Sequence, residues 1–262
     1  MNLIERLRPR PDMRVLVTAG AAGIGAVIAQ GFLEAGARVM VCDVDAEALG
    51  AFAARYPQAA VTPTDVSDPP AVERLFEEVE AHLGGLDVVI NNAGIAGPTG
   101  TIDQLPLDDI RHTLDVDLLG QFLVLRLAVP LLRAGGDGVI INISSVAGRL
   151  GYGLRTPYAA AKWGIVGLTA SLAKELGPEG IRVNAILPGV VRGPRIERVI
   201  RDRAAASGVS YQEMEAEYLK MSSLRCMVEP EDIATMALFL CSPAGARISG
   251  QAISVCGNVE TL

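Results

Sequence analysis

Short apolar runs alternate with helix-length amphipathic segments along nearly the whole chain, and this alternation limits the possible folds more than any other feature. The strand-like runs lie at 14–19, 38–43, 59–66, 86–94, 138–145, 181–189 and 250–257. The helical patterns lie at 23–35, 69–83, 107–133, 157–176 and 230–241, with a further one at 195–220 that is interrupted at Ser207 and Gly208. Apolar strands separated by helices form parallel sheets with right-handed crossovers. The sequence therefore predicts an α/β fold, a doubly wound parallel sheet of the Rossmann type with helices on both faces.

No linker or repeat interrupts this pattern, so we expect an N-terminal extension (1–13) followed by a single domain (14–262). The 30 acidic residues outnumber the 23 basic ones, which argues against a nucleic-acid partner. Four cysteines without a CxxC pair, and two histidines, offer no metal site by spacing and fit a reducing compartment. Charges break the N-terminal apolar run, and no stretch has the length of a membrane span. We expect a cytoplasmic protein without a membrane partner or a metal.

The first strand leads into a glycine-rich turn, "VLVTAGAAGIGAVIAQGF" (15–32). Gly20, Gly23 and Gly25 would let the backbone approach a pyrophosphate at the start of a helix, although tight turns also need glycine for packing alone. Asp43 ends the next strand, where a carboxylate can bind ribose hydroxyls and would repel a 2′-phosphate. The pattern favours NAD over NADP as the cofactor. The alternative is that Asp43, with Asp45, merely caps the next helix.

A serine, a tyrosine and a lysine stand together in "SSVAGRLGYGLRTPYAAAKWG" (144–164). Lys162 follows Tyr158 by four residues and shares its helix face, so its charge would lower the pKa of the phenol. Tyr158 could then act as general base in alcohol oxidation and as general acid in ketone reduction. Ser145 could hydrogen-bond the substrate oxygen. The alternative is a buried tyrosine packed on Trp163 beside a solvated lysine.

With "NNAG" (91–94) and the glycine turn, these three residues make the chain resemble the short-chain dehydrogenase/reductase family from Arg14 to Gly257. The resemblance implies a single domain with a seven-stranded sheet and assembly as a homo-oligomer, often a tetramer. It implies that Lys162 also binds the nicotinamide ribose. Further cofactor contacts implied by it are Ile24, Asp65, Val66, Asn91, Ala93, Gly94, Pro188, Gly189 and Val191.

The chain departs from the family pattern at four places. Ala19 stands at the first glycine of the turn, with Gly20 one position later, and "VCGN" replaces a common "VDGG" near the C-terminus. Gly193 replaces a threonine that often contacts the nicotinamide. Asp117 replaces an asparagine that the resemblance implies is catalytic. Asp117 could serve a water-linked proton relay, or it could simply bind nearby backbone in a kinked helix.

Basic residues predominate in the two segments expected to flank the substrate. No acid occurs between Gly138 and Lys174, and "VVRGPRIERVIRDR" (190–203) is rich in arginine. We hypothesise that Arg149, Arg155, Arg192 and Arg195 bind an anionic substrate such as a hydroxy acid or acidic sugar, or else face solvent or a neighbouring subunit. Solvent or a subunit contact is expected for Arg198, Arg201 and Arg203. Residues 195–224 are expected to form a helical flap over the substrate.

Three functions remain open at this stage. The first is an NAD-dependent oxidoreductase that interconverts a secondary alcohol (a polyol, sugar or hydroxy acid) and its ketone or lactone. The second is a 3-ketoacyl-carrier reductase, which would usually require NADPH, and Asp43 argues against it. The third is a protein that binds NAD as a signal without turnover.

Overall fold

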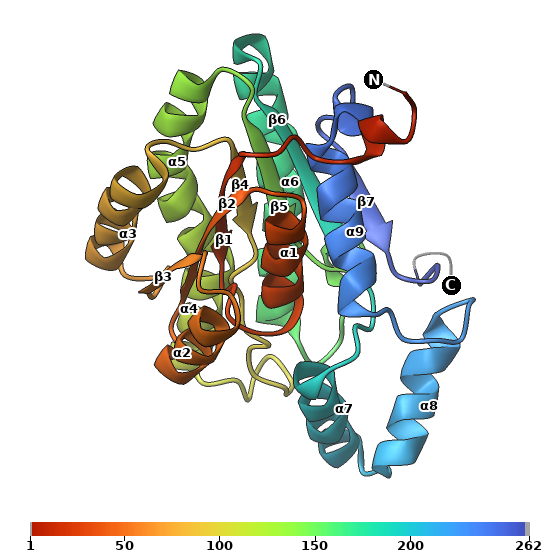
Figure 1. Ribbon diagram of the computed structural model, residues 1–262. Helices are drawn as coiled ribbons and strands as arrows, with labels where there is room; N and C mark the ends of the chain where they lie inside the picture. Colours follow the sequence, from red (N-terminus) through yellow and green to blue (C-terminus); the bar gives the residue numbers. More distant parts are fainter. Residues whose placement is uncertain (1, 260–262) are drawn as a thin grey trace.

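One parallel sheet of seven strands organises the computed structural model, which describes residues 2–259. The strands follow the order β3-β2-β1-β4-β5-β6-β7 across the sheet (Figure 1). Their bounds are β1 (Arg14–Thr18), β2 (Arg38–Asp43), β3 (Ala60–Pro63), β4 (Val88–Asn91), β5 (Val139–Ile143), β6 (Arg182–Pro188) and β7 (Ala252–Val255). The predicted α/β fold with a doubly wound sheet is confirmed.

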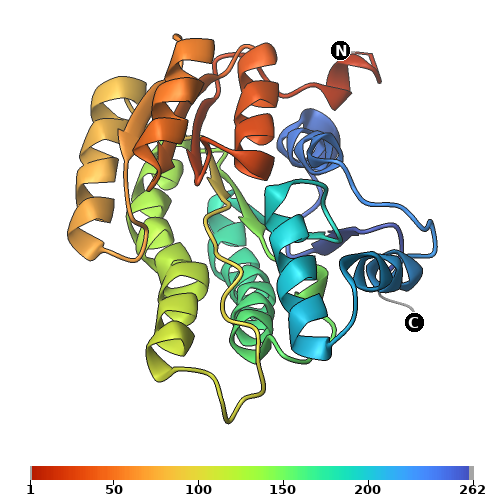
Figure 2. The same cartoon turned by 90° about the horizontal axis from the view of Figure 1, so that it is seen from below.

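Helices cover both faces of the sheet, as Figure 2 shows from below. They are α1 (Gly23–Glu34), α2 (Ala46–Arg55), α3 (Pro69–Leu83), α4 (Leu107–Leu114), α5 (Gly120–Gly135), α6 (Thr156–Leu176), α7 (Pro194–Ser207), α8 (Tyr211–Met221) and α9 (Pro230–Cys241). The cores on the two faces are separate: one contains α1, α2 and α9, and the other contains α3, α5 and α6. Neighbouring residues of one strand therefore belong to opposite cores, as Val15 and Leu16 do.

The expected long helix at 107–133 contains a local irregularity. Five residues, Asp115–Leu119, form a π-helical turn between α4 and α5. The wider turn changes the direction in which following side chains point, and such turns often occur at functional sites. Apolar periodicity does not reveal this turn, because the segment is helical on both sides of it.

The N-terminal extension packs against the end of α9. Its short 3-10 turn, Glu5–Leu7, contacts the 3-10 turn Pro243–Gly245, and the Arg6 guanidinium donates to the Pro243 carbonyl oxygen at 3.4 Å. Pro9 and Met13 are buried. Within residues 2–259, no helix is both long and apolar enough to cross a membrane.

Three of the four cysteines are buried: Cys42, Cys241 and Cys256. Cys42 and Cys241 are buried free thiols, as the sequence predicted. Burial in apolar surroundings raises the pKa of each to about 12. Both thiols are therefore protonated near neutral pH.

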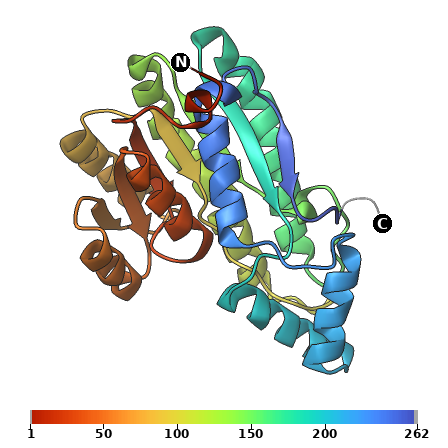
Figure 3. The same ribbon diagram turned by 45° about the vertical axis from the view of Figure 1, so that its right-hand side comes forward.

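All seven strands end at the same edge of the sheet, and α7 and α8 extend beyond that edge (Figure 3). The glycine turn, Asp43, the 91–94 loop and Ser145 follow β1, β2, β4 and β5. The topology thus gathers the candidate residues in one region, as expected for ligand sites in open parallel sheets.

Candidate active site

The glycine turn after β1 shows why the displaced glycine is tolerated. Ala19 adopts a left-handed φ of 47°, in the place where the family pattern has glycine. A Cβ at Gly20 would lie 2.9 Å from both the Val17 carbonyl oxygen and the Val41 side chain. Gly25 is still more restricted, because a Cβ there would lie 2.2 Å from the Ala19 carbonyl oxygen. Close backbone packing therefore requires Gly20 and Gly25, while Ala19 accepts a less favourable conformation.

Helix α1 begins at this turn with free backbone donors. No side chain of residues 2–259 caps its N-terminus, in contrast to α2, where the Asp45 carboxylate accepts from Glu47 N and Ala48 N. Gly23 has a φ of 52° and open space where its Cβ would be. Uncapped N–H groups and the positive end of the helix dipole suit an anion. The turn therefore fits the pyrophosphate of a dinucleotide.

Asp43 and Asp45 have different tasks. Asp45 is the N-cap of α2. The partly buried Asp43 instead accepts from Ala21 N through Oδ2 and from Asp45 N through Oδ1, both at 3.2 Å. Its carboxylate is thereby held against the glycine turn, so the capping alternative accounts for Asp45 alone. The predicted ribose contact of Asp43 stays a prediction.

The 91–94 loop joins the glycine turn to the rest of the site. The buried Asn91 side chain pairs with the Gln121 backbone carbonyl of α5, and the Gln121 amide returns a bond to the Asn91 carbonyl, both at 3.3 Å. Asn92 Nδ2 donates to the Thr18 and Ala19 carbonyl oxygens at 3.0 Å. The neighbouring Asn92, which the sequence analysis did not select, is thus the residue that fastens this loop to the glycine turn.

Tyr158 and Ser145 come together from α6 and from the end of β5. Ser145 caps the 3-10 turn Val146–Gly148 by accepting from Ala147 N at 3.1 Å. Burial by itself would raise the pKa of the Tyr158 phenol. The charges of Lys162 and Arg195, a hydrogen bond with Ser145 and the charge of Arg155 outweigh that effect and hold the pKa below its ordinary value. This is the direction that a tyrosine base requires.

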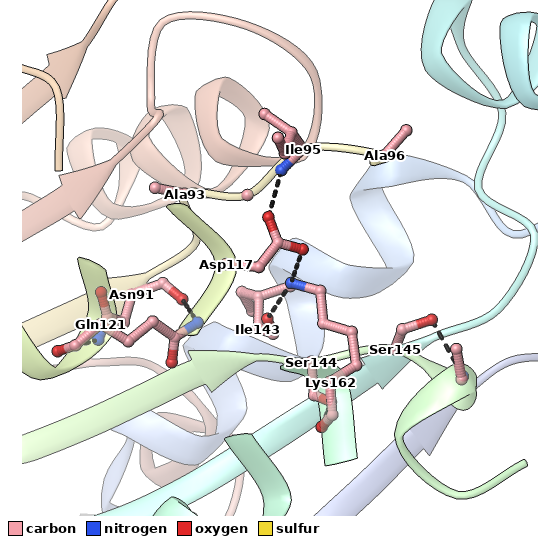
Figure 4. Close-up of polar contacts among 12 residues, drawn as sticks. Asn91, Ala93, Ile95, Ala96, Asp117, Gln121, Ile143, Ser144, Ser145 and Lys162 are labelled. Atoms are coloured by element: carbon pink, nitrogen blue, oxygen red, sulfur yellow. Dashed lines mark hydrogen bonds and ion pairs between the residues drawn. The ribbon is translucent and has the colours of Figure 1, made fainter. Parts of the chain in front are cut away.

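Lys162 is not solvated but lies 97% buried beside Asp117 (Figure 4). Its Nζ atom is 5.5 Å from the centre of the Tyr158 ring and 3.4 Å from both Asp117 Oδ2 and the Ile143 carbonyl oxygen. Its own backbone carbonyl accepts from the Ser144 hydroxyl at 2.8 Å. The alternative of a solvated lysine is therefore wrong.

Asp117 is fully buried in the π-helical turn, and its two oxygens have different partners. Oδ1 accepts from Ile95 N at 2.6 Å, which ties the turn to the loop after β4. Oδ2 makes the ion pair with Lys162 and no hydrogen bond within the described residues. The predicted backbone contact in an irregular helix is thus present, and the same carboxylate also contacts the cation beside Tyr158.

The remaining predicted cofactor contacts lie around the same edge. Asp65 uses Oδ1 for its own turn, accepting from the backbone and hydroxyl of Ser67 at 2.8 and 2.6 Å, and Val66 is buried beside it. Strand β6 ends at Pro188. The next residue, Gly189, packs closely on Cys256, and a Cβ added at Gly189 would lie 2.7 Å from the Cα atom of Cys256. Val191 pairs with Val228 in an isolated bridge. Their roles as cofactor contacts stay predictions, as do those of Ile24, Ala93 and Gly94.

The four predicted substrate arginines fall into two groups. The exposed Arg192 pairs with Glu229 at 2.9 Å, and Arg149 donates to the Ala252 carbonyl oxygen of β7. Arg155 lies over the Tyr158 ring, 4.3 Å from its centre, and Arg195 donates to the Gly94 carbonyl oxygen at 3.0 Å. Glu229 already compensates the charge of Arg192, whereas the charges of Arg195 and Arg155 act on the Tyr158 phenol. The role of all four arginines in substrate binding stays a prediction.

Comparison with known proteins gives consistent matches over almost the full length. The family model described as enoyl-(acyl carrier protein) reductase matches residues 19–258. Galactitol 2-dehydrogenase of Agrobacterium fabrum is 36% identical, with 93% of this chain and 95% of the relative covered. 2-Dehydro-3-deoxy-L-rhamnonate dehydrogenase (NAD(+)) of Sphingomonas sp. is 34% identical, with 94% and 95% covered. A crystal structure of an actinorhodin polyketide ketoreductase variant with NADPH superposes with a TM-score of 0.91 at 31% identity, covering 97% of this chain and all of the other.

Proposed function

Since this chain belongs to the short-chain dehydrogenase/reductase family of oxidoreductases, we propose that it oxidises a secondary alcohol with NAD, or reduces the corresponding ketone or lactone with NADH. The observation that carries the proposal is the Tyr158 phenol, whose pKa is lowered by Lys162 and neighbouring arginines at the ligand-binding edge of the sheet. One relative is named as a dehydrogenase of galactitol and another as a dehydrogenase of 2-dehydro-3-deoxy-L-rhamnonate. These names support a polyol, a sugar or a related acid as the substrate.

The proposed roles follow from the positions of the side chains. A bound nicotinamide dinucleotide supplies the group that accepts or donates the hydride. In oxidation, the Tyr158 phenolate takes the hydroxyl proton of the alcohol, and in reduction its phenol returns a proton to the carbonyl oxygen. Ser145 hydrogen-bonds that oxygen and stabilises the charge that develops on it. Lys162 lowers the pKa of the Tyr158 phenol, which favours the phenolate, and binds the nicotinamide ribose.

Asp43 supports NAD as the cofactor rather than NADP. A carboxylate held at the glycine turn by Ala21 N can accept hydrogen bonds from ribose hydroxyls and repels a 2′-phosphate. No arginine or lysine lies between Thr18 and Gln30 to bind such a phosphate. The relatives differ on this point, because one is named for NAD(+) and one structure contains NADPH. The cofactor must therefore be measured.

A turnover panel tests the proposed function directly. We expect the purified protein to reduce NAD with at least one member of a panel of polyols, sugars and hydroxy acids, and to use NADP far more slowly. A faster NADPH-dependent reduction of an acetoacetyl thioester would support the ketoacyl reductase alternative instead. NADH binding without turnover of any panel member would support a sensor. The expected homotetramer and cytoplasmic location stay predictions.

Asp117→Asn is expected to keep activity within about tenfold of the parent. Asparagine retains an oxygen for Ile95 N, so the π-helical turn stays tied to the loop. Removing a negative charge 3.4 Å from the Lys162 ammonium leaves that cation less compensated, which favours the Tyr158 phenolate. The pH range in which the oxidation rate increases should therefore shift to lower values. Initial rates across pH check this, and a complete loss of activity would show that the carboxylate itself is needed.

A further inference from the structure

Two arginines and three tyrosines form a stacked cluster next to the proposed catalytic phenol. Arg155 lies 4.3 Å from the centre of the Tyr158 ring and 5.1 Å from that of Tyr152. Arg203 lies 5.1 Å from the centre of the Tyr152 ring and 5.6 Å from that of Tyr218. The Tyr152 and Tyr218 hydroxyls share a hydrogen bond of 2.5 Å. The cluster thus joins the start of α6 to both α7 and α8.

The positive charge of this cluster has no carboxylate to balance it within residues 2–259. Arg155 is 96% buried, yet among the described residues its guanidinium donates only to the Ala96 carbonyl and, weakly, to the Tyr152 hydroxyl. In the part of the chain that the structure describes, its Nε atom has no hydrogen-bond partner, and neither has the buried Nε atom of Arg203. The recorded ion pairs of arginine involve other positions, such as Arg192 with Glu229.

Arg203 was expected to face solvent or another subunit, and in the structure its side chain is only partly exposed. Its guanidinium lies against the ring of Tyr152, in the loop before α6, and against that of Tyr218 on α8. Periodicity could not reveal this, because both tyrosines approach Arg203 only through the tertiary fold. The cation–π contacts offset part of the cost of burying the charge, but they supply no counter-ion.

We propose that Arg155 and Arg203 form an anion subsite that binds the carboxylate of a hydroxy acid or keto acid while its carbinol or carbonyl group reacts at Tyr158. This inference rests on the proposed function and names its substrate class. Buried charges are normally paired, and a guanidinium with a free Nε–H matches the geometry of a carboxylate. Arg155 contacts the Tyr158 ring, so an anion bound to it lies within the length of a small substrate from the reacting phenol.

The cluster also connects substrate binding to the helices at the edge of the sheet. Arg203 belongs to α7 and Tyr218 to α8, and these two helices pack against each other through a small core that includes Val199, Ile200 and Met214. Exposed arginines on the same helix, such as Arg201, take no part in that core. An anion held by Arg155 and Arg203 would therefore bridge α6 and α7, which agrees with the predicted flap at 195–224.

Matched substrates that differ at one charged end test the subsite. We would compare gluconate with glucitol, 3-hydroxybutyrate with its amide, and glucitol 6-phosphate as the phosphate arm. The parent protein should show a kcat/KM at least tenfold higher for a carboxylate than for its uncharged partner. Arg203→Met keeps the aliphatic length but removes the charge. It should lower the ratio of the two kcat/KM values at least tenfold, mainly by raising KM for the carboxylate. Arg203→Lys should retain part of it, and Arg201→Met, the control on the same helix, should retain all of it.

A binding measurement separates this inference from the proposed function. Thermal unfolding with gluconate or 3-hydroxybutyrate, in the presence of NADH, should show stabilisation that Arg203→Met removes. Turnover of uncharged alcohols without any preference for an acid would overturn the subsite and leave the proposed function standing. Arg203-dependent stabilisation without turnover of any alcohol would support the subsite and count against the proposed function. If the acids were neither preferred as substrates nor able to stabilise the protein, the subsite would be overturned. A preference for the phosphate alone would overturn the carboxylate assignment.

Discussion

Tyr158→Phe is expected to lower kcat by about 10³-fold, within the range of roughly 10² to 10⁴ that a positioned acid or base contributes. The substitution removes only the hydroxyl that takes or returns the proton. The ring stays in place, so its contacts with Arg155 and Lys162, at 4.3 and 5.5 Å from its centre, are preserved. Steady-state kinetics on the substrate found by the panel, together with NADH affinity, check this. NADH binding should change little.

The pH dependence gives this prediction a second readout. Oxidation needs the phenolate, so its rate should rise as pH increases through the lowered pKa of Tyr158, and reduction should show the opposite trend. The phenylalanine variant should lose that dependence along with most of its rate. Tyr56→Phe is the matched control, because Tyr56 packs on Phe52 with 4.9 Å between ring centres and ends α2, whereas the site lies at the edge of the sheet where α2 begins. If Tyr158→Phe kept more than about a tenth of the parent kcat, the proposed proton transfer would be wrong.

Local sequence patterns predicted the fold, and they selected residues that the structure brings together at one edge of the sheet. Apolar runs mark the strands because both faces of a parallel sheet are buried, and parallel strands bring their carboxyl ends to one edge. The spacing of Tyr158 and Lys162 survives folding because both belong to one regular helix, α6. Ser145 reaches them because β5 ends beside that helix.

Contacts between distant segments could not be predicted in the same way. The π-helical turn that buries Asp117 against Lys162 leaves no mark in apolar periodicity. Asn92 looks equivalent to Asn91 in the sequence, and only the packing of β1 against β4 shows which of them reaches the glycine turn. Arg203 is one of several arginines on α7, and its selection depends on where α8 and the loop before α6 come to lie. Each of these residues acts through a partner that is remote in the chain.

Asp43→Asn is expected to lower the preference for NAD over NADP by about 100-fold, measured as the ratio of the two kcat/KM values. The amide keeps the size of the carboxylate but loses the charge that repels a 2′-phosphate and strengthens hydrogen bonds from ribose hydroxyls. Hydrogen bonds to a charged group are worth roughly 1.5 to 3 kcal/mol, and about 1.4 kcal/mol corresponds to a factor of ten. Weaker binding of NAD and more tolerance of NADP both contribute to the change.

Asp45→Asn is the matched control for that experiment, since it makes the same substitution two residues away. Asparagine caps helices about as well as aspartate, so α2 should keep its N-terminus when the carboxylate that accepts from Glu47 N and Ala48 N is replaced. The cofactor preference of Asp45→Asn should stay within about twofold of the parent. The Asp45 carboxylate caps α2, whereas it is the Asp43 carboxylate that accepts from the glycine turn at Ala21 N. Equal effects of the two variants would mean that charge near α2, and not the position of Asp43 at the turn, sets the preference. An unchanged ratio in Asp43→Asn would remove the assignment of NAD by this residue, while leaving the proton transfer at Tyr158 untouched.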